Sequence, residues 1–218
     1  VVNLTPPGAE PHDLELSPRD VERVQRADVV LYLGEGFMPA LEDAVEGAEN
    51  GVDLLAGESL HKATEAHGHR EEETGHEEEE ESGLDPHVWL DPTRYATLVG
   101  KIADALGEPD AAAELEAELD ELDAEFRAGL ASCERREIVT SHAAFGYLAD
   151  AYDLTQISLT GISPEVEPSA RAIEALVEEV EEEGATTVFF ETLVSPRLAE
   201  TVAREAGVDT AVLNPLEG

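Results

Sequence analysis

The chain has few basic residues. Its 218 residues include 13 Lys and Arg against 51 Asp and Glu, which gives a formal net charge of -38. Only Lys62 and Lys101 are lysines. A surface this acidic repels phosphate backbones and anionic lipid headgroups. The charge therefore excludes nucleic acid and anionic membrane surfaces as partners.

The acidic residues are spread along the whole chain, with one dense run at residues 71–81. One interpretation is bulk cation binding. The other is a surface adapted to high salt, where screening over about 3 Å at molar ionic strength removes the self-repulsion. The even spread favours the second interpretation and is typical of a protein from a halophile. We therefore expect folding to weaken in dilute buffer.

Cysteine and long apolar runs are also scarce. Cys133 is the single cysteine, so no internal disulfide can form. No apolar run approaches the roughly 20 residues of a membrane span. The chain opens at Val1 without an initiating Met, and we expect it to be a piece of a longer protein. Its hydrophobic content of 42% is enough to bury a core.

Short apolar runs alternate with helical patterns along the chain. The run at 29–33 is typical of a parallel strand that is buried on both faces, and Ser17-Pro18 is a helix start. The alternation predicts an α/β fold with two α/β lobes, each with a mostly parallel sheet flanked by helices. We expect strands at 1–5, 29–33, 52–55, 138–140, 156–159, 187–190 and 210–213, and helices at 18–27, 39–49, 93–106, 110–131, 143–152, 169–183 and 196–206.

The element order also predicts the domain organisation. We expect an N-terminal lobe at 1–108, which includes a His/Glu-rich loop at 61–82, a long rigid linking helix at 109–132 and a C-terminal lobe at 133–218. Two such lobes imply a cleft between them. Ligands of open parallel sheets bind beyond the carboxyl ends of the strands. The side chains in the loops at these ends are therefore the first candidates for a site.

The seven histidines fall into two groups. The first group lies in the His/Glu-rich loop, whose composition is typical of a disordered, weak and plural zinc collector, although a charge run is more often a solvated loop. We expect this loop to be an accessory that is dispensable for tight binding, so that deletion of residues 61–82 leaves the tight site intact. Its histidines are His61, His67, His69 and His76.

The second group is His12, His87 and His142, each in a loop at the edge of an α/β element. Any one of them alone is more often a capping or surface residue. Three imidazoles from separate strand ends can converge on one ion, and a tetrahedral zinc site needs such ligands at about 2.0–2.1 Å. Together with the neighbouring collector, they predict a metal site.

The segments around these histidines carry a resemblance. The chain is similar, over essentially its whole length and in the same order, to the zinc-binding ABC-transporter solute-binding proteins of the cluster A-I (ZnuA/TroA-like) family. The segments that carry the resemblance are Pro7–Asp13, Asp85–Pro92, Ser141–Leu148, Gly161–Ser169, Phe189–Pro196 and Val212–Gly218.

The resemblance implies metal ligation by His12, His87 and His142. Many members have an Asp as the fourth ligand where this chain has Asn214, and members that end in a similar Asn-Pro-Leu-Glu use the Glu. We therefore expect Glu217 as the fourth ligand, with water as the alternative. The manganese-binding branch has a carboxylate at the position of His142, so the histidine favours Zn²⁺ over Mn²⁺.

Three polar residues are candidate partners of these ligands rather than ligands. We expect each of them to orient a metal ligand through a hydrogen bond, as outer carboxylates do for metal-bound imidazoles. They are Glu191, Asp85 and Asn214. Glu191 has two alternatives, since it is also a candidate ligand and a candidate general base. For Asp85 a role in capping the turn is an equal alternative.

The function that the resemblance implies is the extracellular zinc-binding component of an ABC importer. Such a protein captures Zn²⁺ in the cleft and delivers it to permease and ATPase subunits in the membrane; we expect a monomer, secreted or lipid-anchored, and not an enzyme. Binding needs neutral imidazoles, so affinity should fall as the pH drops through about 6.5. The alternatives are a zinc-dependent hydrolase, a manganese-binding homologue, and a zinc buffer without a transporter.

Overall fold

The computed structural model describes residues 1–63, 83–164 and 168–217, which form two compact units. The first unit combines Val1–Leu60, Val88–Ala131 and the C-terminal Glu217. The second unit combines His61–His87 and Ser132–Leu216. The described residues 61–63 and 83–87 thus group with the C-terminal part, whereas the sequence placed them in the N-terminal lobe. The predicted domain boundaries stay predictions. None of the helices in the described residues has the length and the apolar character of a membrane span.

The first unit contains a small parallel sheet and two short helices. Strands β1 (Val30–Tyr32) and β2 (Gly51–Asp53) pair in parallel, and helices α1 (Pro18–Arg26) and α2 (Pro39–Val45) contact each other beside them. The buried core of this part consists of six apolar side chains: Val24, Val30, Phe37, Met38, Leu41 and Val45.

Helix α1 begins where the sequence predicts, because Ser17 and Asp20 form a capping box. The Ser17 hydroxyl accepts the backbone N–H of Asp20 at 3.3 Å, and the Asp20 carboxylate accepts the backbone N–H of Ser17 at 3.2 Å. These reciprocal contacts fix the start of the helix at Ser17.

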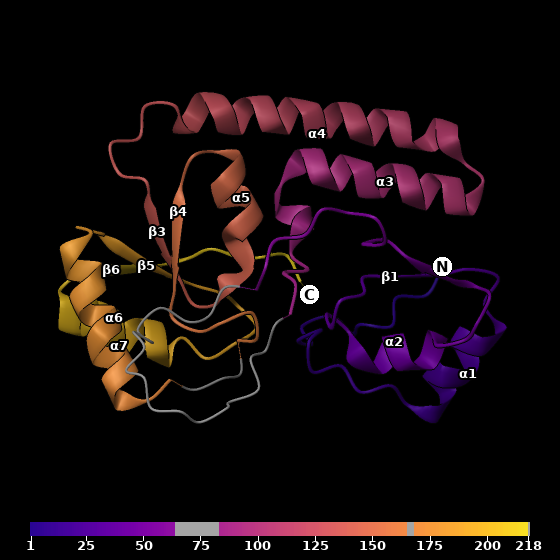
Figure 1. The fold of residues 1–218 in the computed structure, drawn as a ribbon, viewed down its shortest axis with the longest axis horizontal. Coiled ribbons are helices and arrows are strands. Elements are labelled where there is room, and N and C mark those ends of the chain that lie inside the picture. Colours follow the sequence, from indigo (N-terminus) through magenta and orange to yellow (C-terminus); the bar gives the residue numbers. More distant parts are fainter. Residues whose placement is uncertain (64–82, 165–167, 218) are drawn as a thin grey trace. The chain divides into compact units, whose positions relative to one another are not determined.

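A long helical pair completes the first unit (Figure 1). Helix α3 (Pro92–Leu106) follows the short 3-10 helix η1 (Val88–Leu90) and packs along α4 (Pro109–Leu130). Gly107 ends α3 with φ of 71°, a left-handed conformation that glycine adopts without strain. The small and apolar side chains that face each other between the helices are Val99, Ala103, Ala112 and Leu119.

The second unit is built on a sheet of four parallel strands in the order β4-β3-β5-β6. All four strands therefore end at the same edge of the sheet. In the register, Val139 of β3 pairs with Ile157 of β4 on one side and with Val188 of β5 on the other. The strands are β3 (Glu137–Thr140), β4 (Thr155–Ser158), β5 (Thr187–Phe190) and β6 (Asp209–Val212).

Helices cover this sheet. Helix α5 contacts β4, and α6 packs against α7, which contacts β5 and β6 (Figure 1). The helices are η2 (Ala143–Phe145), α5 (Gly146–Ala151), α6 (Ala170–Glu182) and α7 (Arg197–Ala206). Fully buried Val139, Leu159, Leu176, Val180, Val188 and Val202 lie in the core of the unit.

The predicted fold class is confirmed, since parallel sheets are flanked by helices. The strand predicted at residues 1–5 is wrong: the Asn3 carboxamide accepts the backbone N–H of Thr5 at 3.1 Å, and this local contact competes with a strand ladder. The helix predicted at 39–49 ends at Val45, shortly before Gly47 with φ of 73°. The single helix predicted at 143–152 is η2 followed by α5.

Candidate metal site

His87 is a buried imidazole that is held by the carboxylate two residues before it. Its side chain is fully buried, and Asp85 is 2% exposed. The Asp85 Oδ1 atom accepts the backbone N–H of His87 at 2.9 Å and lies 2.7 Å from the ring Nδ1. Because an ionised carboxylate can only accept, the proton of the neutral ring belongs on Nδ1. The Nε2 atom then carries the lone pair that a metal ion needs.

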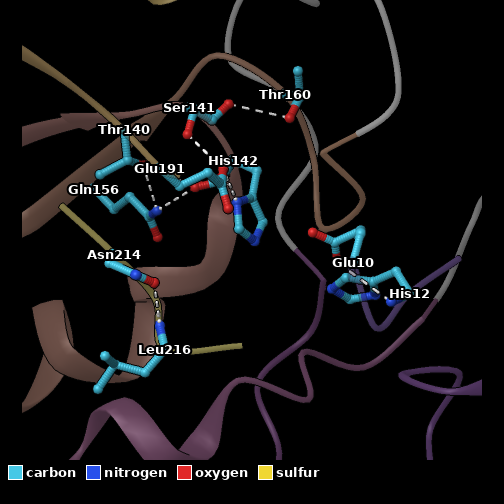
Figure 2. Close-up of polar contacts among 10 residues, drawn as sticks. All are labelled: Glu10, His12, Thr140, Ser141, His142, Gln156, Thr160, Glu191, Asn214 and Leu216. Atoms are coloured by element: carbon cyan, nitrogen blue, oxygen red, sulfur yellow. Dashed lines mark hydrogen bonds and ion pairs between the residues drawn. The ribbon is translucent and has the colours of Figure 1, made fainter. Parts of the chain in front are cut away.

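His142 has the same arrangement at the carboxyl edge of the sheet in the second unit. It lies two residues after the end of β3 and is 1% exposed. Its Nδ1 atom lies 2.7 Å from Oε1 of Glu191, the residue that follows β5. The Ser141 hydroxyl donates to the same oxygen at 2.6 Å, and Figure 2 shows both side chains directed at Glu191. Strand adjacency therefore brings together groups that are distant in sequence.

The structure brings the His87 and His142 rings into contact within the second unit. Their centroids lie 5.3 Å apart at an interplanar angle of 64°. A ring nitrogen of His87 lies within 4.8 Å of one of His142. Two buried imidazoles with carboxylates on their Nδ1 atoms have the arrangement that outer carboxylates impose on metal-ligating histidines, so the pair can offer two ligand atoms to one metal ion.

His12 belongs to the first unit, where aromatic contacts position its ring. The His12 and Phe37 ring centroids lie 4.8 Å apart in an edge-to-face arrangement, and Phe37 contacts Trp89 in the same way at 5.1 Å. The backbone N–H of His12 donates to Glu10 Oε1 at 3.3 Å (Figure 2). The ring is thus held by packing on one side, and it is half-buried.

Asn214 is part of a turn that leads to Glu217. Its Oδ1 atom accepts the backbone N–H of Leu216 at 2.8 Å (Figure 2). Its Nδ2 atom donates to the Thr192 hydroxyl at 3.2 Å. Leu216 has φ of 63°, a conformation that is costly for a residue with a side chain. The amide of Asn214 is therefore engaged in shaping the backbone just before the half-buried Glu217.

Of the loop histidines, His61 lies in the described residues, whereas His67, His69 and His76 lie outside them. The His61 ring stacks on Tyr147 with centroids 4.1 Å apart. Sequence reasoning did not single out Tyr147 or Ser141, although both lie in the Ser141–Leu148 segment. A tyrosine on an apolar helix face indicates a core residue. The hydrogen-bond partners of the Tyr147 hydroxyl are distant in sequence, so the sequence alone does not reveal them.

Comparison with known proteins gives consistent results. The whole chain, residues 1–218, matches a family model described as "ZnuA: Zinc-uptake complex component A periplasmic". It is similar to the zinc-binding lipoprotein AdcA of Streptococcus pneumoniae, with 38% identity over 230 residues, 96% of this chain and 44% of that protein. It is also similar to the high-affinity zinc uptake system protein ZnuA of Bacillus subtilis, with 34% identity over 234 residues, 99% of this chain and 71% of that protein.

A solved structure has the same fold. A zinc(II)-bound variant of AdcAII from Streptococcus pneumoniae superposes with a TM-score of 0.78 at 29% identity, covering 96% of this chain and 78% of that one. The chain spans less than half of the length of the streptococcal AdcA relatives, 45% and 44% of two of them.

Proposed function

Because the chain belongs to the ZnuA family of zinc-uptake components, we propose that it is the extracellular zinc-binding component of an ABC metal importer. It captures Zn²⁺ and delivers the ion to a membrane permease. The observation that carries the proposal is the buried contact between His87 and His142, each with a carboxylate 2.7 Å from its Nδ1 atom. Such a pair prepares two Nε2 atoms for one ion.

In this proposal His12 and Glu217 complete the ligand set. Both are half-buried residues, one placed by the aromatic contact with Phe37 and the other by the turn at Asn214. Three imidazoles and one carboxylate form a four-coordinate set that suits borderline-soft zinc better than manganese, which prefers oxygen ligands. Water in place of Glu217 is the alternative for the fourth position.

The partners of the ligands have separate roles. Asp85 and Glu191 fix the ring orientation and tautomer of His87 and His142 through the Nδ1 atoms. Asn214 acts through the backbone, because its Oδ1 atom holds the turn before Glu217. Release to the permease then requires that a ligand withdraws, and acid promotes release because protons compete with zinc for the imidazoles.

The contacts of Glu191 favour transport over hydrolysis. A hydrolase needs a general base aimed at a metal-bound water. The Glu191 Oε1 atom instead contacts the Nδ1 side of His142 and accepts from Ser141, on the ring edge opposite to Nε2. We therefore assign Glu191 to orientation and propose no catalytic role.

The proposed location is extracellular. The family is described as periplasmic, and the similar AdcA of Streptococcus pneumoniae is named a lipoprotein. A lipid anchor, a monomeric state and partnership with a permease and an ATPase are parts of the proposal.

Zinc uptake into proteoliposomes tests the function. The vesicles would contain permease and ATPase subunits of a zinc importer, with the chain added outside together with Zn²⁺. We expect uptake with the wild type and with Glu174→Gln, an exposed change on α6, and loss of uptake with His142→Ala. Uptake that is independent of the added chain would refute the transport role, and zinc binding without uptake would identify a zinc buffer.

A further inference from the structure

The hydroxyl of Tyr147 joins the first residue of the His/Glu-rich loop, His61, to Asp85, which follows the loop. Tyr147 lies in α5 and is 1% exposed. Its hydroxyl accepts the backbone N–H of His61 at 2.8 Å and donates to the backbone carbonyl of Asp85 at 2.8 Å. The His61 ring stacks on the Tyr147 ring at an interplanar angle of 17°. The buried hydroxyl therefore both donates and accepts a hydrogen bond.

The two segments also pair directly. The backbone N–H of Asp85 donates to the carbonyl of His61 at 2.9 Å, and that of Ala63 donates to the carbonyl of Gly83 at 2.9 Å. Lys62 and Leu84 form an antiparallel bridge between them. We call these paired segments, residues 61–63 and 83–85, the stem. The Tyr147 hydroxyl is therefore a third link across the stem, at the end where Asp85 lies.

Asp85 connects the stem to a proposed zinc ligand, because its carboxylate contacts both the backbone and the ring of His87. A second residue of α5 lies near the other carboxylate oxygen: a Cβ added to Gly146 would lie 3.1 Å from Asp85 Oδ2. Gly146 has φ of -57°, a backbone conformation that any residue adopts. The absence of a side chain at this position therefore matters because it leaves space for the Asp85 carboxylate. Helix α5 thus holds the Asp85 carbonyl through Tyr147 and leaves room for the Asp85 carboxylate at Gly146.

We propose that Tyr147 is a positioning residue for zinc binding that acts on His87 through Asp85, with Gly146 leaving room for the carboxylate. This inference rests on the proposed function. Loss of the hydroxyl releases the Asp85 carbonyl from α5 and allows the carboxylate, and with it the His87 ring, to rotate. Loss of outer partners of metal ligands costs about 10–100-fold in metal affinity, and Tyr147 stands one step further out.

The first test compares Tyr147→Phe with Tyr152→Phe in the 218-residue chain at high salt. Tyr152 is also buried and follows the last residue of α5, so it is a matched control for the loss of a tyrosine hydroxyl. Competition with a chelator gives the zinc dissociation constant. The visible absorption of bound Co²⁺ reports the ligand geometry. We expect about a tenfold rise of the dissociation constant and a changed Co²⁺ spectrum for Tyr147→Phe, and wild-type values for Tyr152→Phe.

Gly146→Ala separates positioning from folding. Alanine in place of a helical glycine favours the helix. The added methyl group would nevertheless press on Asp85 Oδ2. We expect a melting temperature equal to or above that of the wild type, together with weaker zinc binding and a changed Co²⁺ spectrum. Should Tyr147→Phe fail to fold, this variant alone decides the proposal.

The outcomes distinguish the two proposals. Wild-type affinity and an unchanged Co²⁺ spectrum in Tyr147→Phe, or in Gly146→Ala if the former does not fold, overturn the positioning role. Absence of zinc binding by the wild-type chain overturns the proposed function itself.

Discussion

At the scale of single residues, the candidate site contains two buried imidazoles, each held by a carboxylate. Burial of an imidazole or a carboxylate is costly unless hydrogen bonds compensate it. His87 with Asp85 and His142 with Glu191 meet this condition through contacts of 2.7 Å. The same contacts leave the opposite ring edges for a metal ion. Stability and metal binding therefore depend on the same few atoms.

Glu191→Gln tests the orienting contact at His142. The amide keeps the size of the side chain but loses the charge that holds the Nδ1 proton, so we expect the zinc dissociation constant to rise about 10–100-fold. Glu174→Gln, an exposed change on α6, is the control and should bind like the wild type. Competitive titration with a chelator measures both. Equal affinities of Glu191→Gln and the control would contradict the orienting role.

Glu42 gives a prediction on pH and stability in the first unit. Burial raises the pKa of this carboxyl above 4.5, against the lowering effect of the hydrogen bond from the Gly36 backbone N–H. The folded state therefore holds the Glu42 proton more tightly than the unfolded state. Its contribution to the free energy of unfolding is present at low pH and is lost as the pH rises from the unfolded pKa through the folded pKa. Glu42→Gln keeps an acceptor for Gly36 and removes the charge.

We expect Glu42→Gln to gain thermal stability relative to the wild type as the pH rises from about 4 to 7, since only the wild type ionises there. Asp43→Asn, at the exposed neighbouring position, is the matched control. Melting curves across this range measure the difference. A difference that is constant with pH, or that favours the wild type at pH 7, contradicts the role given to burial.

At the scale of elements, local signals predict where strands and helices lie but not how they pair. The apolar runs place β3 and β5 to within a residue, and Ser17-Pro18 predicts the start of α1. The order β4-β3-β5-β6, which brings Glu191 to His142, depends on long-range packing. The contact of Tyr147 with Asp85 depends on how α5 docks and has no local signal.

The stem changes the expectation for the His/Glu-rich loop. The backbone of His61 forms hydrogen bonds with the Asp85 backbone and with the Tyr147 hydroxyl. His61 is part of the loop, and it also helps to position Asp85, whose carboxylate contacts His87. We expect a short linker in place of residues 64–82 to leave tight zinc binding intact. Removal of residues 61–82 also removes half of the stem and should weaken binding about tenfold. Isothermal titration at high salt compares the two deletions, and equal affinities would show that the stem has no effect.

At the scale of the whole molecule, net charge dominates. Thirteen basic residues cannot neutralise 51 acidic ones. Ion pairs such as that between Lys101 and Glu58, at 2.7 Å, therefore involve a small share of the carboxylates. The compact state carries the full repulsion in dilute buffer, and salt screens it.

We accordingly expect the melting temperature to rise steeply between low salt and about 1 M KCl, where the screening length falls to about 3 Å. A non-ionic osmolyte such as sucrose at matched osmolality is the control and should give a smaller increase. A melting temperature that does not change with KCl would contradict adaptation to high salt.

We propose that the buried histidines select zinc over manganese. Competitive titration of Zn²⁺ against Mn²⁺ at high salt, with the wild type and His142→Ala, tests it most directly. We predict that the wild type prefers zinc and that His142→Ala loses more zinc affinity than the roughly 10–100-fold expected for an outer partner. A wild type that prefers manganese, or a His142→Ala variant that binds zinc like the wild type, would contradict the claim.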